Sequence, residues 1–215
     1  IPNITVVNEP DFFLDLLATD VTCFNGSNGQ VEVSGLGGVE PIIFNWTNTN
    51  LNTSVITDLV VGSYSLTAID ADGCEKKDSI NIYQPNQLNI TLDSLSNVTC
   101  NGHDDGFLKI NVSGGTGAYS YFWAGPNSFI NTSSVNELGD LYSGSYSLTI
   151  NDQNNCQSIY SVDILEPNPI SITPIITDVS CFGFNDGEIS LDDITGGNSP
   201  YITLWNNGSV SNIID

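Results

Sequence analysis

The chain has 215 residues, of which 25 are acidic and only three, all lysines, are basic, so its formal net charge is -22 at pH 7. A charge of this size repels nucleic acid and anionic membranes, which excludes both as partners. No apolar run approaches the roughly 18 residues of a membrane-spanning helix, so we expect no direct membrane insertion. Because the chain begins at Ile1 and contains no Met, we expect a fragment, with any signal peptide or sorting tail outside it.

One stretch occurs three times, most clearly at 98–106, and organises the chain. Each copy has a cysteine after Val-Thr or Val-Ser and a glycine six residues later, and the cysteines are Cys23, Cys100 and Cys181. Asn or Asp stands directly before each glycine. Because Asn-Gly and Asp-Gly tolerate positive φ in a tight hairpin turn, the stretch predicts a strand, a cysteine, a turn and a second strand.

Two strands follow this turn in every copy. Alternating polar and apolar residues predict a strand with one wet face at 30–34, 107–112 and 188–191. After a Gly-rich turn, a second strand ends in a tryptophan, at 41–46, 118–123 and 200–205. The large residues of this second strand repeat at period two, which favours packing in a core, with stacking on sugars as the alternative.

Two copies continue with a Leu-x-x-Gly-x-Tyr strand, at 59–67 and 141–149, which partly resembles the tyrosine corner of immunoglobulin-like sandwiches. An Asp-x-x-x-Cys turn follows, and then a last alternating strand that ends in Gln84-Pro85 or Glu166-Pro167. Few alanines and many Thr, Val, Ile, Asn and Gly residues favour an all-β fold. We therefore predict tandem immunoglobulin-like β-sandwich repeats.

The order of these parts divides the chain into four predicted segments. They are the tail of a preceding repeat at 1–10, a first full repeat at 11–85, a second full repeat at 86–167 and a truncated third repeat at 168–215. A partial sandwich exposes an unpaired edge and half a core, so we expect the third segment to be the least stable.

Together these motifs resemble tandem SprB repeats, the modules of giant gliding-motility adhesins and related surface proteins of Bacteroidetes. The resemblance rests on the cysteine openings, the Ser113-Gly114-Gly115 turn, the tryptophan and Gly-x-Tyr strands, the Asp-x-x-x-Cys turn and the closing Glu-Pro, in fixed order. It implies a non-catalytic stalk and adhesive surface, exported across the outer membrane by the type IX secretion system to the cell surface. The implied partners are a surface polysaccharide or substratum, neighbouring repeats, and the secretion and gliding machinery.

The cysteines indicate an oxidising compartment. Each full repeat holds an early and a late cysteine, so we predict the disulfides Cys23–Cys74 and Cys100–Cys156. Closing such loops stabilises each repeat by roughly 3 to 5 kcal/mol in the chain-entropy model. Buried free thiols are the alternative, and zinc is disfavoured because no Cys-x-x-Cys occurs. We expect Cys181 to be unpaired, with its partner roughly 30 residues beyond the end of the chain, judging by the repeat length.

Two acidic groups are candidate metal sites. Asp70 and Asp72 begin an Asp-Ala-Asp-Gly sequence that opens like a calcium loop but lacks its later ligands, which makes them weak calcium candidates beside a solvated Asx-type turn. His103-Asp104-Asp105 carries metal-binding groups, but the other copies have Ser27-Asn28 and Asn185-Asp186 there, which favours a role in the turn. Apart from calcium, the sequence indicates no cofactor.

The sequence argues against an enzyme. One histidine, no arginine and no Ser-His or Cys-His pairing leave a nucleophile without an activating base. The spacing of the acidic residues does not exclude the paired carboxylates of a glycosidase. A repeated module argues against one, because repeats increase the length and valency of a protein rather than its number of active sites. Two other functions remain as alternatives: a spacer within an adhesin whose binding head lies elsewhere, and a carbohydrate-binding or spacer module of a secreted polysaccharide-degrading enzyme.

The resemblance also implies a modification. Exported proteins of Bacteroidetes carry O-linked glycans at Asp followed by Ser or Thr and an apolar residue. The chain contains Asp78-Ser79-Ile80 and Asp93-Ser94-Leu95, so Ser79 and Ser94 are predicted O-glycosylation sites.

Overall fold

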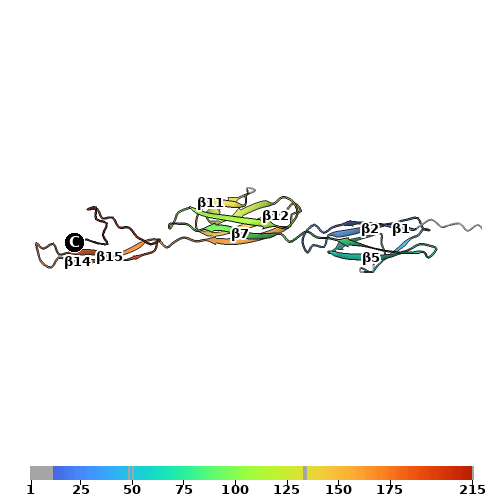
Figure 1. Cartoon of the computed structure of the whole chain (residues 1–215), viewed down its shortest axis with the longest axis horizontal. Coiled ribbons are helices and arrows are strands. Elements are labelled where there is room, and N and C mark those ends of the chain that lie inside the picture. The colour runs from blue at the N-terminus through green and yellow to red at the C-terminus, as the bar shows by residue number, and fades with distance from the viewer. Residues whose placement is uncertain (1–11, 48, 50, 133–134, 215) are drawn as a thin grey trace, which may run out of the picture. The chain divides into compact units, whose positions relative to one another are not determined.

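The computed structural model describes residues 12–47, 49, 51–132 and 135–214 (Figure 1). The segment 1–10, predicted to be the tail of a preceding repeat, lies outside these residues. The chain forms two compact units: unit 1 contains 1–89, 112–119 and 151–158, and unit 2 contains 90–111, 120–150 and 159–215. No helix in the described part of the chain has the length and apolar content needed to cross a membrane.

Two three-stranded antiparallel sheets form a sandwich in unit 1, with the strand orders β1-β2-β4 and β3-β5-β6. Figure 1 shows β1 and β2 on one side of this sandwich and β5 on the other. The strands are β1 Phe13–Thr19, β2 Gly29–Leu36, β3 Ile43–Trp46, β4 Val55–Leu59, β5 Gly62–Ile69 and β6 Glu75–Ile82.

Alternation along the strands determines which side chains form the core of this sandwich. Val31 and Val33 of β2 are buried, whereas Glu32 between them is exposed. Leu66 of β5 and Trp46 of β3 belong to the same buried cluster, so side chains of both sheets meet there. Fully burying a large apolar side chain stabilises the fold by about 1.5 to 3 kcal/mol. The alternating strand and the buried tryptophan predicted for the first repeat are confirmed.

The second repeat contains one three-stranded sheet, β11-β8-β7, and one four-stranded sheet, β10-β9-β12-β13. A 3-10 turn at Pro126–Ser128 lies between β9 and β10. Trp123 and Ile110 are fully buried, as are Leu148 and Ile150 of the Gly-x-Tyr strand β12. The strands are β7 Asn89–Ser96, β8 Gly106–Ser113, β9 Ser120–Ala124, β10 Ile130–Asn131, β11 Glu137–Leu141, β12 Gly144–Asn151 and β13 Gln157–Ile164.

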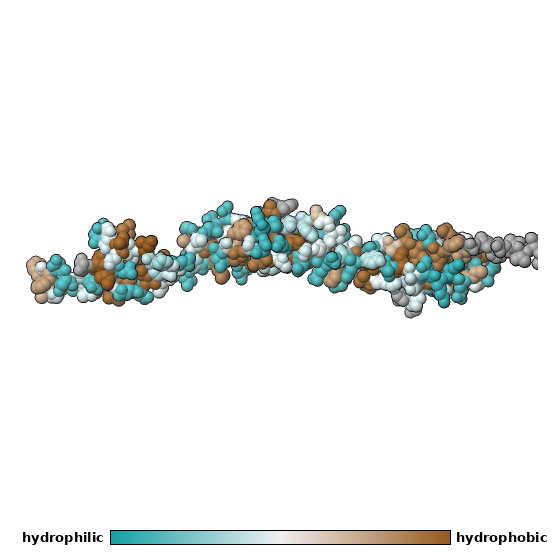
Figure 2. Space-filling model, viewed as in Figure 1, coloured by the Kyte–Doolittle hydropathy of each residue, from teal (hydrophilic) through white to brown (hydrophobic). Residues whose placement is uncertain are grey.

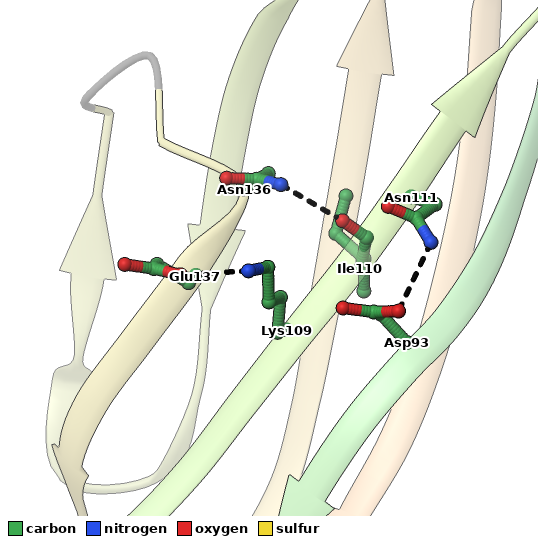
Figure 3. A network of polar contacts seen from close by, with 6 residues as sticks. All are labelled: Asp93, Lys109, Ile110, Asn111, Asn136 and Glu137. Atoms are coloured by element: carbon green, nitrogen blue, oxygen red, sulfur yellow. Dashed lines mark hydrogen bonds and ion pairs between the residues drawn. The ribbon is translucent and has the colours of Figure 1, made fainter.

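Polar contacts hold strands β8 and β11 of the sheet β11-β8-β7 in register (Figure 3). The Asn136 side-chain amide donates to the Ile110 carbonyl at 3.1 Å, and the Asn136 carbonyl accepts from the Ile110 N–H at 2.9 Å. Beside them, Lys109 Nζ lies 3.4 Å from a Glu137 carboxylate oxygen across β8 and β11. Because this ion pair is partly exposed, we expect it to contribute only about 0 to 1 kcal/mol.

Only one sheet, β14-β15-β16, occurs in the described part of the third repeat. Its strands are β14 Ser171–Thr177, β15 Glu188–Thr195 and β16 Ile213–Ile214. The prediction of a strand at 200–205 is wrong, because 201–205 has no regular structure. At the equivalent place β9 pairs with the Gly-x-Tyr strand β12, and the sequence 168–215 contains no such strand.

The all-β sandwich class predicted from the sequence is confirmed, because strands supply nearly all regular structure and the buried residues of the first repeat come from two facing sheets. The repeat boundaries at 85 and 167 stay a prediction. Unit 1 takes in residues 151–158 of the second repeat.

Candidate functional site

An Asn or Asp side chain closes the loop that carries each early cysteine. In the first copy, Asn28 Oδ1 accepts the Thr22 N–H at 3.1 Å, and Asn28 Nδ2 donates to the Thr22 hydroxyl at 2.9 Å. In the second copy, Asp105 accepts both the N–H and the hydroxyl of Thr99. Asp186 accepts the Ser180 N–H at 3.0 Å in the third. Within the His103 group, Asp105 therefore serves the loop.

The predicted hairpin turn at the Asn-Gly and Asp-Gly dipeptides is wrong. Positive φ occurs earlier in the loop, at Asn25 in the first copy and at Gly102 in the second. Gly106 begins β8 and needs to be glycine for another reason: a Cβ there would lie 2.6 Å from the Leu141 carbonyl oxygen. The glycine therefore permits close approach of two backbones, while the residue before it caps the loop.

These clamps lower the pKa of two aspartates. The Thr99 hydroxyl, and then its N–H, hold the pKa of Asp105 below its usual 3.8, against a smaller opposing effect of burial. Ser180 lowers the pKa of Asp186 in the same way. Hydrogen bonds to a carboxylate favour its charged form. Both groups are therefore ionised structural acceptors at neutral pH.

In the two full repeats, the early-cysteine loop is attached to the end of the closing strand of its own repeat. The Val21 N–H donates to the Tyr83 carbonyl at 3.0 Å, and the Asn25 N–H donates to Gln84 Oε1 at 2.8 Å. In the second repeat, the Gly102 N–H donates to Glu166 Oε2 at 2.7 Å. The Gln or Glu before the closing proline thus holds the cysteine loop, a role that the sequence motif alone did not reveal.

The late-cysteine turn is built around a buried aspartate. Asp70, which is 6% exposed, accepts backbone N–H groups from Asp72 at 3.1 Å and Cys74 at 2.8 Å on one oxygen, and from Val39 at 3.1 Å on the other. Burial raises its pKa, but these N–H groups together outweigh that effect and hold the pKa below 3.8. Both oxygens of this calcium candidate are therefore engaged with the backbone, while Asp72 is exposed.

Asp152 repeats this arrangement in the second repeat. One of its oxygens accepts the N–H groups of Asn154 and Cys156, both at 2.9 Å, and the other accepts the Thr116 N–H at 2.8 Å. The Asp152 N–H in turn donates to the Cys156 carbonyl at 3.0 Å. Asp152 therefore fixes the backbone of Cys156 on both sides of its Cα atom, the N–H through its carboxylate and the carbonyl through its own N–H.

Cys23 is bonded to Cys156, 133 residues further along the chain, with their Cα atoms 5.6 Å apart. Beside the disulfide, Asn154 Nδ2 donates to the Thr22 carbonyl at 3.1 Å, and Cys156 Sγ lies 3.3 Å from the same oxygen. We call Thr22, Cys23, Asp152, Asn154 and Cys156 the cysteine junction. All five residues belong to unit 1, and both cysteines are half-buried.

The predicted disulfides within each repeat are therefore wrong. Strand β6 separates Cys74 from Tyr83, the residue that holds the loop of Cys23, and its eight residues extend about 26 Å. A disulfide needs Cα atoms within about 7 Å. In the second repeat β13 separates Cys156 from the loop of Cys100 in the same way, because Val98 in that loop donates to the Leu165 carbonyl.

Cys100 and Cys181 are exposed thiols. The Cys100 loop has the same internal bonds as the Cys23 loop: the His103 N–H donates to the Cys100 carbonyl at 3.1 Å, as the Gly26 N–H does to the Cys23 carbonyl at 3.0 Å. The two loops therefore present their sulfur atoms on equivalent backbones, although Cys23 alone of the two is disulfide-bonded.

The aromatic side chains mainly support the core. The hydroxyl of Tyr64 donates to the Val60 carbonyl, and that of Tyr146 donates to the Tyr142 carbonyl, both at 3.0 Å. These bonds to the residue four positions earlier match the predicted tyrosine corner. Burial raises the pKa of Tyr146. Trp46 and Trp123 are buried, which removes them as platforms for sugars, whereas Trp205 is only partly buried.

The predicted modification sites lie on outer strand surfaces. Ser79 is exposed on β6, opposite Ser65 of β5, and Ser94 is exposed on β7. Their hydroxyl groups are accessible, and their O-glycosylation stays a prediction.

Three of the solved structures that match the chain are the following. An amphioxus IgVJ-C2 molecule matches with 16% identity and a TM-score of 0.35, over 67% of this chain and 99% of that one. The immunoglobulin domains 1–5 of Sidekick-1 match with 8% identity and a TM-score of 0.36, over 89% of this chain and 46% of that one. The BSP domain of a biofilm-associated protein matches with 11% identity and a TM-score of 0.22, over 71% of this chain and 30% of that one.

No curated protein matches the chain. The family model of the SprB repeat matches three times, at residues 18–51, 92–128 and 173–210, which together make up just over half of the chain. Each match includes one early cysteine and its loop. The chain therefore belongs to the SprB repeat family.

Proposed function

We propose that this chain is a non-catalytic repeat segment of a large cell-surface adhesin filament, acting as stalk and adhesive surface in gliding motility. The observation that carries the proposal is the Cys23–Cys156 disulfide, which joins one repeat of the sequence covalently to the next. Disulfides persist in oxidising, extracellular surroundings. A covalent bond of this kind is useful to a protein that is pulled between a cell and a surface.

The electrostatics of the chain support a structural use of its acidic residues. A catalytic carboxylic acid needs a pKa raised toward neutrality. Asp70, Asp105 and Asp186 have lowered pKa values, and each accepts hydrogen bonds that hold a loop. These three carboxylates therefore act as fixed hydrogen-bond acceptors rather than as proton donors.

Export by the type IX secretion system to the outer face of the cell is part of the proposal. The partners would be the secretion and gliding machinery, neighbouring repeats and a polysaccharide or other substratum. The net charge of -22 disfavours nucleic acid as a partner. It also keeps filaments of such repeats apart in solution through mutual repulsion.

Labelled Fab fragments raised against the 215-residue chain test the proposal on living cells of the source bacterium. We expect them to label intact cells, and to slow gliding and attachment when added in excess, whereas Fab fragments of unrelated specificity leave both unchanged. Labelling only after the cells are permeabilised would contradict the proposal. A glycan array with the same chain tests the alternative, because only a carbohydrate-binding module predicts saturable binding to one defined sugar.

A further inference from the structure

An apolar groove of about 770 Å³ lies open on the third repeat, within unit 2. Ile189 and Leu191 of β15 line it, together with Tyr201 and Trp205. Figure 2 shows brown, apolar atoms at the surface of the part that Figure 1 labels β14 and β15. Exposed apolar patches of this kind mark places where another element packs.

The full repeats show what covers the corresponding place. Ile189 and Leu191 align with Leu108 and Ile110, which are fully buried in the second repeat. There the second sheet contains β12 and β13, and Leu148 of β12 is itself fully buried. The segment 144–167, which contains both strands and the Asp-x-x-x-Cys turn between them, is therefore the kind of hairpin that fits the groove.

A second observation places a cysteine of such a hairpin near Cys100. The Thr99 carbonyl accepts the side-chain amide of Asn198 at 2.8 Å, within unit 2. Asn198 directly follows the Gly-Gly pair of the third repeat, and Thr116 directly follows the Gly-Gly pair of the second repeat. Thr116 lines one small pocket together with Thr22 and Asn154. The Gly-Gly turn of the third repeat therefore contacts the Cys100 loop, and the equivalent turn of the second repeat lies beside the Cys23 loop.

We propose that the open groove and Cys100 form one docking site for a β-hairpin that carries the Gly-x-Tyr and closing strands of an SprB repeat and packs on the third repeat, and that the late cysteine of that hairpin bonds to Cys100. The bonding pattern is then staggered: the early cysteine of each repeat is joined to the late cysteine of the next, as Cys23 is to Cys156. Two thiols lose two electrons and two protons in this step. A small-molecule or protein disulfide accepts them and becomes two thiols.

A peptide of residues 144–167 tests the docking site without an added oxidant, because Cys156 of the peptide is supplied as its mixed disulfide with thionitrobenzoate. The Cys100 thiolate attacks the peptide sulfur, the peptide–Cys100 disulfide forms, and coloured thionitrobenzoate leaves with the electron pair. The protein is the full chain with its native disulfide closed and with Cys74→Ser and Cys181→Ser. Absorbance gives the rate, and mass spectrometry identifies the adduct.

We expect Cys100 to react at least about 100-fold faster with this peptide than with a scrambled peptide carrying the same activated cysteine, since docking raises the effective concentration into the millimolar range. A chain that keeps Cys181 but carries Cys100→Ser serves as the comparison, and it is expected to treat the two peptides alike. Equal rates for the two peptides at Cys100, within about twofold, would overturn the proposal.

Variants in the groove separate docking from thiol reactivity. Leu191→Asp places a charge in the groove and is expected to lower the rate at Cys100 to that of the scrambled peptide, whereas Asp192→Asn, at an exposed neighbouring position, leaves the rate unchanged. A fluorescent peptide with Cys156→Ser provides a second measurement. It is expected to bind the Cys100→Ser chain saturably by anisotropy, and failure to saturate would sink the proposed site.

Discussion

The carbonyl oxygen of Thr22 accepts a hydrogen bond from the side-chain amide of Asn154, 132 residues further along the chain. This bond brings the loop of one repeat against the turn of the next, directly beside the Cys23–Cys156 disulfide. The hydrogen bond and the disulfide therefore hold the same two segments. The hydrogen bond can orient the two cysteines before the disulfide forms.

The disulfide is the first feature to test. Peptide mapping of the non-reduced chain is expected to find Cys23 linked to Cys156, and reduction is expected to lower the free energy of unfolding of this region by about 2 to 5 kcal/mol, because the bond closes a long loop. Denaturant unfolding with and without reductant measures the difference. A Cys23→Ser, Cys156→Ser chain is the control, and its stability should not respond to reductant at this site. A map that links Cys23 to Cys74 would contradict the structure.

Asp152 is expected to stabilise the late-cysteine turn independently of the disulfide. In a chain with Cys23→Ser and Cys156→Ser, Asp152→Ala leaves three N–H groups without their acceptor and is expected to cost about 2 to 4 kcal/mol. Asp152→Asn keeps one acceptor oxygen, so we expect a smaller loss. Thermal and denaturant unfolding give both values, and equal stability of the Ala variant and its parent would show that the carboxylate is dispensable.

Asp105 gives a prediction about pH. Its folded pKa lies below 3.8, chiefly because of the Thr99 hydroxyl, so its stabilising contribution is complete above about pH 3.8 and is lost as the pH falls through the folded pKa. Thr99→Val is expected to raise the pKa of Asp105 toward 3.8 and to weaken the acid dependence of stability. Carboxyl NMR titration measures the shift. Thr91→Val, at an exposed position on β7, is the matched control, and the same shift in both variants would refute the clamp.

Two glycines of the second repeat test the interpretation of the Asp-Gly dipeptide. Gly106→Ala is expected to destabilise the repeat by about 1 to 3 kcal/mol, because the added Cβ would lie 2.6 Å from the Leu141 carbonyl oxygen. Gly139→Ala has no atom within 4 Å of its Cβ and is expected to change stability by less than about 0.5 kcal/mol. Urea unfolding compares the two variants. A larger loss at Gly139 would mean that close approach is not the reason for glycine at 106.

Local patterns predicted the strands, because they depend on contacts between near neighbours. The alternation around Val31 and Val33 and the placement of Trp46 and Trp123 follow from the period of a strand and the need to bury large side chains. The strand expected at 200–205 failed because a strand needs a partner, and the pairing strand is absent from that part of the sequence. Periodicity indicates which face is apolar but does not supply the neighbouring strand.

The cysteine junction could be predicted only in part. The sequence predicts the strand between Cys74 and Tyr83. Its eight residues are long enough to keep the two cysteines of a repeat too far apart for a disulfide. What the sequence did not reveal is that Gln84 and the Tyr83 carbonyl hold the Cys23 loop at the far end of that strand. The partner of Cys23 is consequently set by packing across repeats, which no spacing within one repeat encodes.

The Cys23–Cys156 bond also changes how the chain transmits tension. A pull between Phe12 and Pro167 follows the backbone to Cys23, crosses the disulfide and continues from Cys156, so residues 24–155 form a closed covalent loop outside the direct path. The direct path can lengthen to only about 80 Å even if it loses all structure, whereas the reduced chain can reach roughly 550 Å. Oxidation therefore makes this stretch of the protein nearly inextensible, and a reductant makes it a long elastic tether.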